Sequence, residues 1–252
     1  MLTTNDRYNL VWQKYSYYKA GASRVIRSGF ALFGVYPHEY GAFASRTRSE
    51  SDAEHSNGLA VLLFLIHSFF PELFNGEDLT NYLINAFFHE IGEFEYGDVP
   101  DDGKRDEDKK NTSELIAFSD YFAEFPLDVS EPIIFNFIDF QQKNTTRFAQ
   151  ISYLGDKLEA ILQAIIYESN GQSGSYDSEP LLEYGASESD QKLRELTGST
   201  SMVDIFAAQF LLNSRYFDEE IRAVFINILR AAVIDLRGQW FPWSNRPPFN
   251  CP

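Results

Sequence analysis

Only four histidines occur in this chain, so each can be weighed separately: His38, His55, His67 and His89. His89 stands in the segment F-F-H-E-I-G-E-F-E-Y-G-D, where Glu90 follows directly and Glu93 comes one turn later. On a continuous helix these three side chains fall within an arc of about 100°, beside an apolar face. An imidazole and two carboxylates against apolar surface are costly unless a cation or hydrogen bonds compensate them. The segment therefore indicates a metal site, and glutamates that face solvent at a helix end remain an equal alternative.

His55 and Asp156 are two further candidates, and each has an ordinary alternative. His55 projects onto the same helical side as Leu59 and Leu62, so it points inward, where a single histidine is more often a hydrogen-bonded core residue than a ligand. Asp156 lies in Y-L-G-D-K-L-E-A-I-L-Q-A-I-I-Y-E, where small helical neighbours leave room around the carboxylate. Taken alone, Asp156 would be interpreted as a solvated side chain.

Three blocks occur in order along the chain: E-H-S at 54–56, H-E-x-x-E-x-x-x-G-D at 89–98, and G-D-K-L-E-A-I-L-Q-A from 155. Together they resemble the HD-domain superfamily of metal-dependent phosphohydrolases. The likeness is closer to the 5′-deoxynucleotidase-like branch, in which H-D-x-x-E-x-x-x-G-D-x-P follows an upstream R-x-E-x-x-x-E-H. The resemblance covers about residues 45–170 and implies an all-α helical bundle.

The resemblance also implies a role for each matching position. One divalent cation would be held by four residues: His55, His89, Glu90 and Asp156. Glu93 would orient or deprotonate the attacking water, and Asp98 would lie near the substrate and its leaving group. Arg48, with Glu50 beside it, takes the place of the family's upstream arginine. Mixed histidine and carboxylate ligands accommodate Mn, Co, Ni, Fe, Zn or Mg, so the sequence leaves the metal open.

Two departures from the family pattern affect these expectations. Glu90 stands where the family has aspartate and adds one methylene, about 1.5 Å of reach. The site could keep its metal with shifted geometry, bind a different ion, or have lost strong activity. The family's further arginine for the phosphate has no counterpart in G-V-Y-P-H-E-Y-G at 34–41, so Arg46, Arg48, Lys104 or Lys157 would have to bind the phosphate.

The first functional hypothesis is an enzyme, a metal-dependent phosphohydrolase that cleaves a small phosphate monoester such as a nucleoside 5′-monophosphate. The alternative is a degenerate HD protein with weak or no catalysis, which binds metal or nucleotide and acts through partners. Four histidines are too few for the multi-histidine two-metal variants of the superfamily.

Helices must position these residues, because the spacing of apolar residues is helical through most of the chain. About eight or nine helices are predicted, within 8–19, 23–35, 57–70, 79–95, 112–125, 130–142, 147–169, 201–214 and 218–236. Polar connections are expected at 96–111 and 171–190. We expect a single domain over residues 1–252, with an HD core at about 45–170, additional helices within 1–36 and 190–236, and an irregular aromatic tail at 238–252.

Composition excludes several partners. With 21 Lys and Arg against 37 Asp and Glu, the net charge of −16 argues against a nucleic acid polymer or an anionic membrane as partner. A small anionic phosphate remains compatible, because a metal can reverse the sign of the charge locally. The single cysteine, Cys251, and the absence of an apolar run near the beginning of the chain lead us to expect a cytoplasmic protein. A homodimer stays an open alternative.

Overall fold

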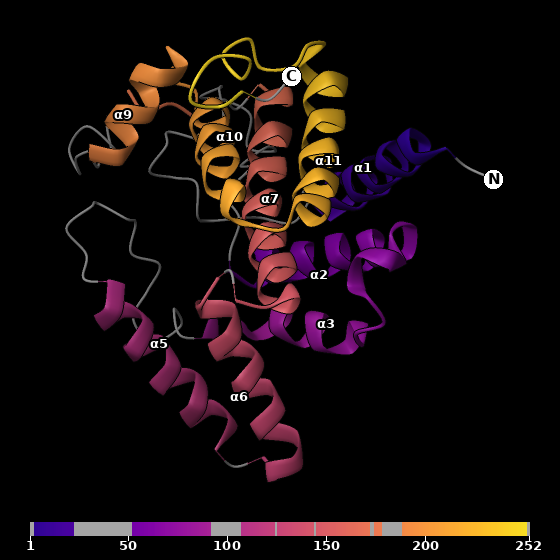
Figure 1. Cartoon of the computed structure of the whole chain (residues 1–252), viewed down its shortest axis with the longest axis vertical. Coiled ribbons are helices and arrows are strands. Elements are labelled where there is room, and N and C mark those ends of the chain that lie inside the picture. Colours follow the sequence, from indigo (N-terminus) through magenta and orange to yellow (C-terminus); the bar gives the residue numbers. More distant parts are fainter. Residues whose placement is uncertain are drawn as a thin grey trace, which may run out of the picture.

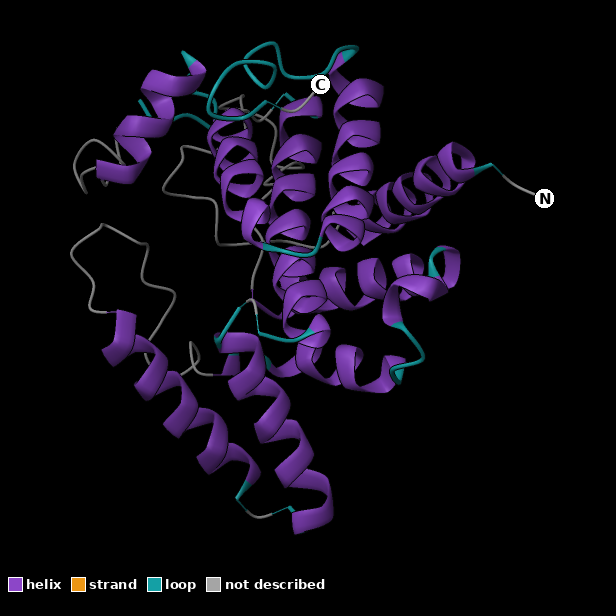
Figure 2. Ribbon diagram, in the orientation of Figure 1, coloured by secondary structure: helices purple, strands orange, loops and turns teal. Residues whose placement is uncertain are grey.

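The computed structural model describes residues 3–22, 52–91, 107–123, 125–143, 145–171, 174–177 and 188–250. Within these ranges the regular structure is helical, with nine α-helices and no strand (Figure 2). The α-helices are α1 (Thr4–Ala22), α2 (Asp52–Phe69), α3 (Leu79–Phe88), α5 (Glu107–Phe122), α6 (Leu127–Gln141), α7 (Arg147–Ser169), α9 (Glu188–Thr197), α10 (Met202–Asn213) and α11 (Glu219–Arg237). The all-α prediction is confirmed, while the helix expected at 23–35 lies outside the described residues.

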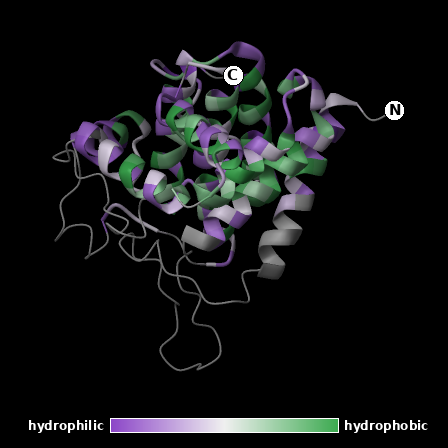
Figure 3. Ribbon diagram, turned by 90° about the horizontal axis from the view of Figure 1, so that it is seen from below, coloured by the Kyte–Doolittle hydropathy of each residue, from purple (hydrophilic) through white to green (hydrophobic). Residues whose placement is uncertain are grey.

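Helix α7 is the central element of the fold. It packs against α2, α3, α6, α10 and α11 and also touches α1 (Figure 1). The helix begins where the Thr146 side chain accepts a hydrogen bond from the Ala149 N–H at 3.1 Å. Apolar residues such as Leu154, Leu158 and Leu162 are fully buried on its faces. A helix that is apolar on more than one face is expected to lie inside the bundle, and the hydrophobic residues gather where the helices meet (Figure 3).

A row of buried polar residues interrupts this apolar surface: Ser152, Asp156, Glu159 and Gln163. Their spacing of four, three and four residues places them along one side of α7. Charged side chains inside a protein are costly unless they are paired or hold a cation. This side of α7 must therefore face compensating groups from other elements.

Helix α3 ends near the buried polar row of α7, where its C-cap residue His89 is one of the compensating groups. The end of this helix differs from the prediction. Its N-cap is Asp78, whose side chain accepts a hydrogen bond from the Thr80 N–H at 2.9 Å. The helix predicted to continue to residue 95 ends at Phe88, with His89 as its C-cap and Glu90 in the turn that follows. Consecutive side chains diverge by about 100° on a helix, whereas the turn allows His89 and Glu90 to point to one place.

Helices α5 and α6 form a hairpin that extends away from the other helices (Figure 1). Phe118, Phe122 and Phe137 of this hairpin form a small second core together with Ile91. Helix α5 begins at Glu107, so the polar connection predicted to reach residue 111 is wrong over its last five positions. Acidic residues are favourable in the first turn of a helix, and an ion pair of 2.9 Å between Lys110 and Glu114 adds support on this face.

The C-terminal helices and tail close the other end of the bundle. The Trp243 indole donates a hydrogen bond of 2.8 Å to Asp204 Oδ1 of α10, and Phe241 is buried beside it. Arg237 at the end of α11 pairs with Glu168 of α7 at 2.6 Å. These contacts hold the described part of the aromatic tail on the helices. None of the described helices combines the length and hydropathy that a bilayer span requires.

Candidate metal centre

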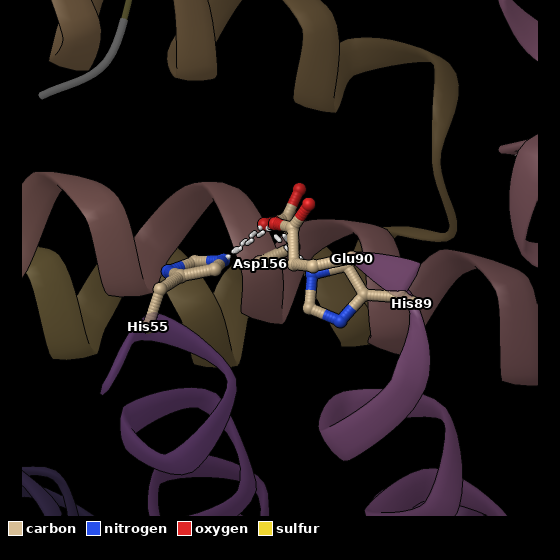
Figure 4. A group of neighbouring side chains, drawn as sticks. All are labelled: His55, His89, Glu90 and Asp156. Atoms are coloured by element: carbon tan, nitrogen blue, oxygen red, sulfur yellow. Dashed lines mark hydrogen bonds and ion pairs between the residues drawn. The ribbon is translucent and has the colours of Figure 1, made fainter. Parts of the chain in front are cut away.

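Four side chains from three elements converge beside the polar row of α7: His55, His89, Glu90 and Asp156. His55 comes from the first turn of α2, and Asp156 from the middle of α7 (Figure 4). One ligand atom from each residue lies within 4.8 Å of the others. Asp156 Oδ1 is 2.8 Å from His55 Nε2 and 3.7 Å from His89 Nε2. Such a set of two imidazoles and two carboxylates suits a divalent transition metal or magnesium.

The environment of His89 tests whether a cation fits. Its Nδ1 lies 3.0 Å from the carbonyl oxygen of Ala86, so in the neutral ring this nitrogen donates and Nε2 carries the lone pair. Nε2 is buried and makes no hydrogen bond among the described residues, although Glu90 Oε1 is 3.1 Å away. A buried acceptor nitrogen directed at carboxylates is a chemical fit for a metal ion.

The charges in the cluster are strongly coupled. Burial disfavours the imidazolium of His89, but Glu90 and Asp156 outweigh this effect and raise the His89 pKa to about 10. Burial likewise opposes the charged form of Glu90, yet His89 and His55 lower its pKa to about 2. The pKa of His55 is raised well above its ordinary value, because Glu159 and Asp156 overcome the effect of burial. The carboxylates therefore require positive charge at this point, which a divalent cation would supply.

Asp156 itself is buried, which removes the alternative of a solvated side chain. Burial raises the pKa of its carboxyl group, but Lys157 and the two histidines hold that pKa well below its ordinary value. Lys157 Nζ lies 2.7 Å from Asp156 Oδ2 while about half of the lysine side chain is exposed. The lysine predicted to bind phosphate thus stands next to the cluster.

The remaining predicted site residues, Arg48, Glu93 and Asp98, lie outside the described residues, as do Arg46, Glu50 and Lys104. Their roles stay predictions. The structure brings together the four residues expected to hold the metal and places Lys157 beside them.

Sequence reasoning missed Glu159, which is fully buried on α7. Its Oε2 lies 2.6 Å from His55 Nδ1, on the side of the ring opposite Asp156. One signal was available, because Glu159 follows Asp156 by three residues in a predicted helix and so shares its side. Its carboxylate was indistinguishable in sequence from a solvated glutamate.

A cavity of about 590 Å³ adjoins the cluster. His89, Glu90 and Asp156 line one part of its wall, and the rest comes from α5, α6, α7 and α10. Three lysines reach this cavity: Lys110, Lys143 and Lys157. The candidate metal centre therefore faces a space large enough for a small organic ligand.

Comparison with known protein families gives one match. The family model described as "HD domain" matches residues 41–195, more than half of the chain, and this range contains all four clustered residues. No similar protein was found among curated proteins, and none among solved structures. HD-domain proteins are generally metal-dependent hydrolases, which agrees with the cluster described above. The chain belongs to the HD-domain family.

Proposed function

We propose that this protein is a divalent-metal-dependent phosphohydrolase that cleaves a small phosphate monoester, a nucleoside 5′-monophosphate, as in the 5′-deoxynucleotidase-like branch. The observation that carries the proposal is that three of the four clustered residues, His89, Glu90 and Asp156, line a cavity that three lysines also reach. Lys110 pairs with Glu114 and Lys157 with Asp156, so Lys143 together with a bound cation would supply most of the positive charge that favours a phosphate ligand. A cytoplasmic location, expected from the sequence, is part of the same proposal.

Two of the lysines would bind the phosphate. Lys143 Nζ and Lys157 Nζ each lie 5.7 Å from the centre of the Tyr153 ring, so both ammonium groups lie near the same residue of the cavity wall. When bound, a divalent cation would polarise a phosphoryl oxygen and lower the pKa of the attacking water. The lysines would balance the remaining phosphate charge, while Glu93 and Asp98 keep the roles that the family resemblance implies.

Helix α10 would hold the leaving group. It contributes Phe206, Gln209, Phe210 and Asn213 to the cavity wall. Aromatic rings and amides supply stacking surface and hydrogen-bonding groups, which suit a base and sugar better than an aliphatic alcohol. The cavity volume of about 590 Å³ falls within the range of small-molecule sites.

A substrate screen tests the proposal. The chain is stripped of metal, reloaded with Mn²⁺ or Co²⁺, and assayed with nucleoside monophosphates, sugar phosphates and cyclic nucleotides. We expect metal-dependent release of phosphate from nucleoside monophosphates, and none from the His89→Ala variant. No phosphate release from any compound by the metal-loaded chain would refute the proposal.

The second candidate function is a binding protein with weak or no catalysis, and Glu90 is the observation that favours it. Glutamate in place of aspartate changes the length of one ligand. Nevertheless Glu90 Oε1 lies 3.1 Å from His89 Nε2 and 3.6 Å from His55 Nε2, so the carboxylate reaches the cluster. Metal binding without turnover in the same screen would favour this candidate.

A further inference from the structure

Helix α1 lies beyond the segment matched by the family model, yet one of its side chains is connected to the metal cluster. Tyr15 is fully buried, and its hydroxyl donates a hydrogen bond of 2.6 Å to Glu159 Oε1. The other oxygen of this carboxylate, Oε2, lies 2.6 Å from His55 Nδ1. A continuous chain of contacts therefore runs from α1 through α7 to a candidate ligand on α2.

The contact with Glu159 determines which nitrogen of His55 faces the cluster. His55 Nε2 points to Asp156 Oδ1 at 2.8 Å, so this nitrogen is the one that can coordinate a cation. Coordination requires a lone pair on Nε2 and hence the ring proton on Nδ1. An Nδ1–H that donates to Glu159 satisfies this requirement, and a carboxylate in that position also makes the imidazole a stronger ligand.

Glu159 needs support of its own, because it is fully buried. A carboxylate inside a protein is costly unless its oxygens accept hydrogen bonds. Tyr15 supplies such a bond to Oε1 and leaves Oε2 directed at His55. A core that needed only to be filled would be served by an apolar side chain at either position, so this pair points to a role at the neighbouring cluster.

We propose that Glu159 and Tyr15 are positioning residues for the metal centre: Glu159 fixes the tautomer and orientation of His55, and Tyr15 fixes Glu159. The inference rests on the proposed function only in requiring that the cluster binds a divalent cation. It assigns to α1, outside the matched segment, a part in metal affinity that acts through Glu159 and His55.

Two substitutions test the chain of contacts in the whole 252-residue chain. Glu159→Gln keeps the size of the side chain but removes its charge, and Tyr15→Phe removes only the hydroxyl. Metal-free samples are titrated with Mn²⁺ by calorimetry, and the absorption spectrum of the Co²⁺ form reports ligand geometry. We expect Glu159→Gln to weaken Mn²⁺ binding about 10- to 100-fold and Tyr15→Phe to weaken it by about three- to tenfold, with altered Co²⁺ bands in both.

Trp12→Phe is the matched control on the same helix. Trp12 Nε1 donates a hydrogen bond of 2.9 Å to Asp235 of α11, so its removal loosens α1 without breaking the contact with Glu159. Mn²⁺ affinity should stay within about twofold of that of the unsubstituted chain. If Trp12→Phe weakens binding as much as Tyr15→Phe, the effect comes from docking of the helix and the inference is overturned.

The outcomes separate this inference from the proposed function. If the unsubstituted chain binds Mn²⁺ but does not hydrolyse phosphate esters, the proposed function is contradicted. The two variants still test the positioning role in that case. If the unsubstituted chain is active and the Glu159→Gln and Tyr15→Phe variants bind Mn²⁺ as tightly as the unsubstituted chain, only the positioning role is contradicted. Absence of any Mn²⁺ binding by the unsubstituted chain overturns both. If Glu159→Gln does not fold, Tyr15→Phe with its control decides the question.

Discussion

Gly155 of α7 lies so close to Leu63 of α2 that a Cβ atom at position 155 would be 2.9 Å from Leu63 Cδ2. The same atom would be 3.1 Å from Leu59 Cδ1. Glycine thus allows the two helices to approach just beside Asp156. Because α2 carries His55 and α7 carries Asp156, this approach helps to set the 2.8 Å separation of the two side chains.

Gly155→Ala should therefore destabilise the fold and weaken cation binding. Alanine gains about 1 kcal/mol of helix propensity over glycine, but an added methyl group in a packed core costs about 1–3 kcal/mol. We expect a net loss of roughly 1 kcal/mol in the free energy of unfolding and a melting temperature lower by about 2–4 °C. Calorimetric unfolding and an Mn²⁺ titration measure the two effects.

The double variant with Leu63→Ala provides the control. Leu63→Ala alone should cost about 2–5 kcal/mol, because it leaves a cavity in the core. If the contact with Leu63 is the cause, the double variant should lose less than the sum of the two single losses. Strict additivity would show that the methyl group at position 155 acts elsewhere.

Much of the fold could be predicted from the sequence because its strongest signals are local. The bounds of α7 agree with the predicted helix at 147–169, where apolar residues recur at helical spacing and Thr146 can cap the first turn. The four clustered residues were also identified, since the family blocks fix their order and spacing. The structure adds that these blocks meet beside a cavity, whose wall includes α10, about fifty residues further along the chain.

The end of α3 and the role of Glu159 were not predicted, because both depend on contacts between residues far apart in the sequence. The end of α3 was predicted too late because the helical spacing of apolar residues continues to residue 95. In the structure, contacts of His89 with α7 and of Glu90 with α2 compensate for the loss of helical structure after Phe88. Glu159 was missed because its partner Tyr15 lies 144 positions away. Only the packing of α1, α2 and α7 shows that this glutamate is inside the protein.

Addition of a divalent cation should raise the melting temperature. At about 100 times the dissociation constant, a ligand that binds only the folded state contributes about 2.7 kcal/mol. For a chain of this length that corresponds to an increase of roughly 5–11 °C. His89→Ala should abolish the increase, because it removes the buried nitrogen that faces the two carboxylates. Thermal unfolding with and without Mn²⁺ measures it.

His67→Ala is the matched control for this experiment. His67 packs edge-on against Phe74, at 4.8 Å between ring centres, and does not belong to the cluster. The variant should unfold at a lower temperature than the unsubstituted chain but keep the full increase on addition of Mn²⁺. An equal loss of the increase in both histidine variants would argue against His89 as a ligand.

Glu90→Asp should weaken cation binding, although aspartate is the residue typical of the family. The turn after α3 places Glu90 Oε1 at 3.1 Å and 3.6 Å from the two histidine nitrogens. Shortening the side chain by one methylene withdraws the oxygen by about 1.5 Å, and we expect an approximately tenfold loss of Mn²⁺ affinity. Glu114→Asp, the same change in another glutamate that lines the cavity, should leave the affinity unchanged. Tighter binding and a large gain in phosphatase activity in Glu90→Asp would instead identify the natural protein as a weakened enzyme.

Lys143→Met should impair phosphate binding without affecting the metal. Lys143 is exposed just after the end of α6, reaches the cavity, and is separate from the four clustered residues. Removal of one charge that contacts phosphate should raise KM about tenfold and weaken inhibition by inorganic phosphate to a similar extent, with Mn²⁺ affinity within about twofold.

Lys192→Met on α9 removes an equal charge away from the cavity and should change neither constant. A KM that is unaffected by Lys143→Met would leave Lys157 as the phosphate-binding lysine. Lys157 is the harder residue to test, because its ammonium group pairs with Asp156 at 2.7 Å and its loss would alter the metal centre as well. Parallel Mn²⁺ titrations of Lys143→Met and of the corresponding Lys157→Met variant separate these cases. If a lysine binds only the phosphate, its substitution raises KM but leaves the Mn²⁺ affinity unchanged.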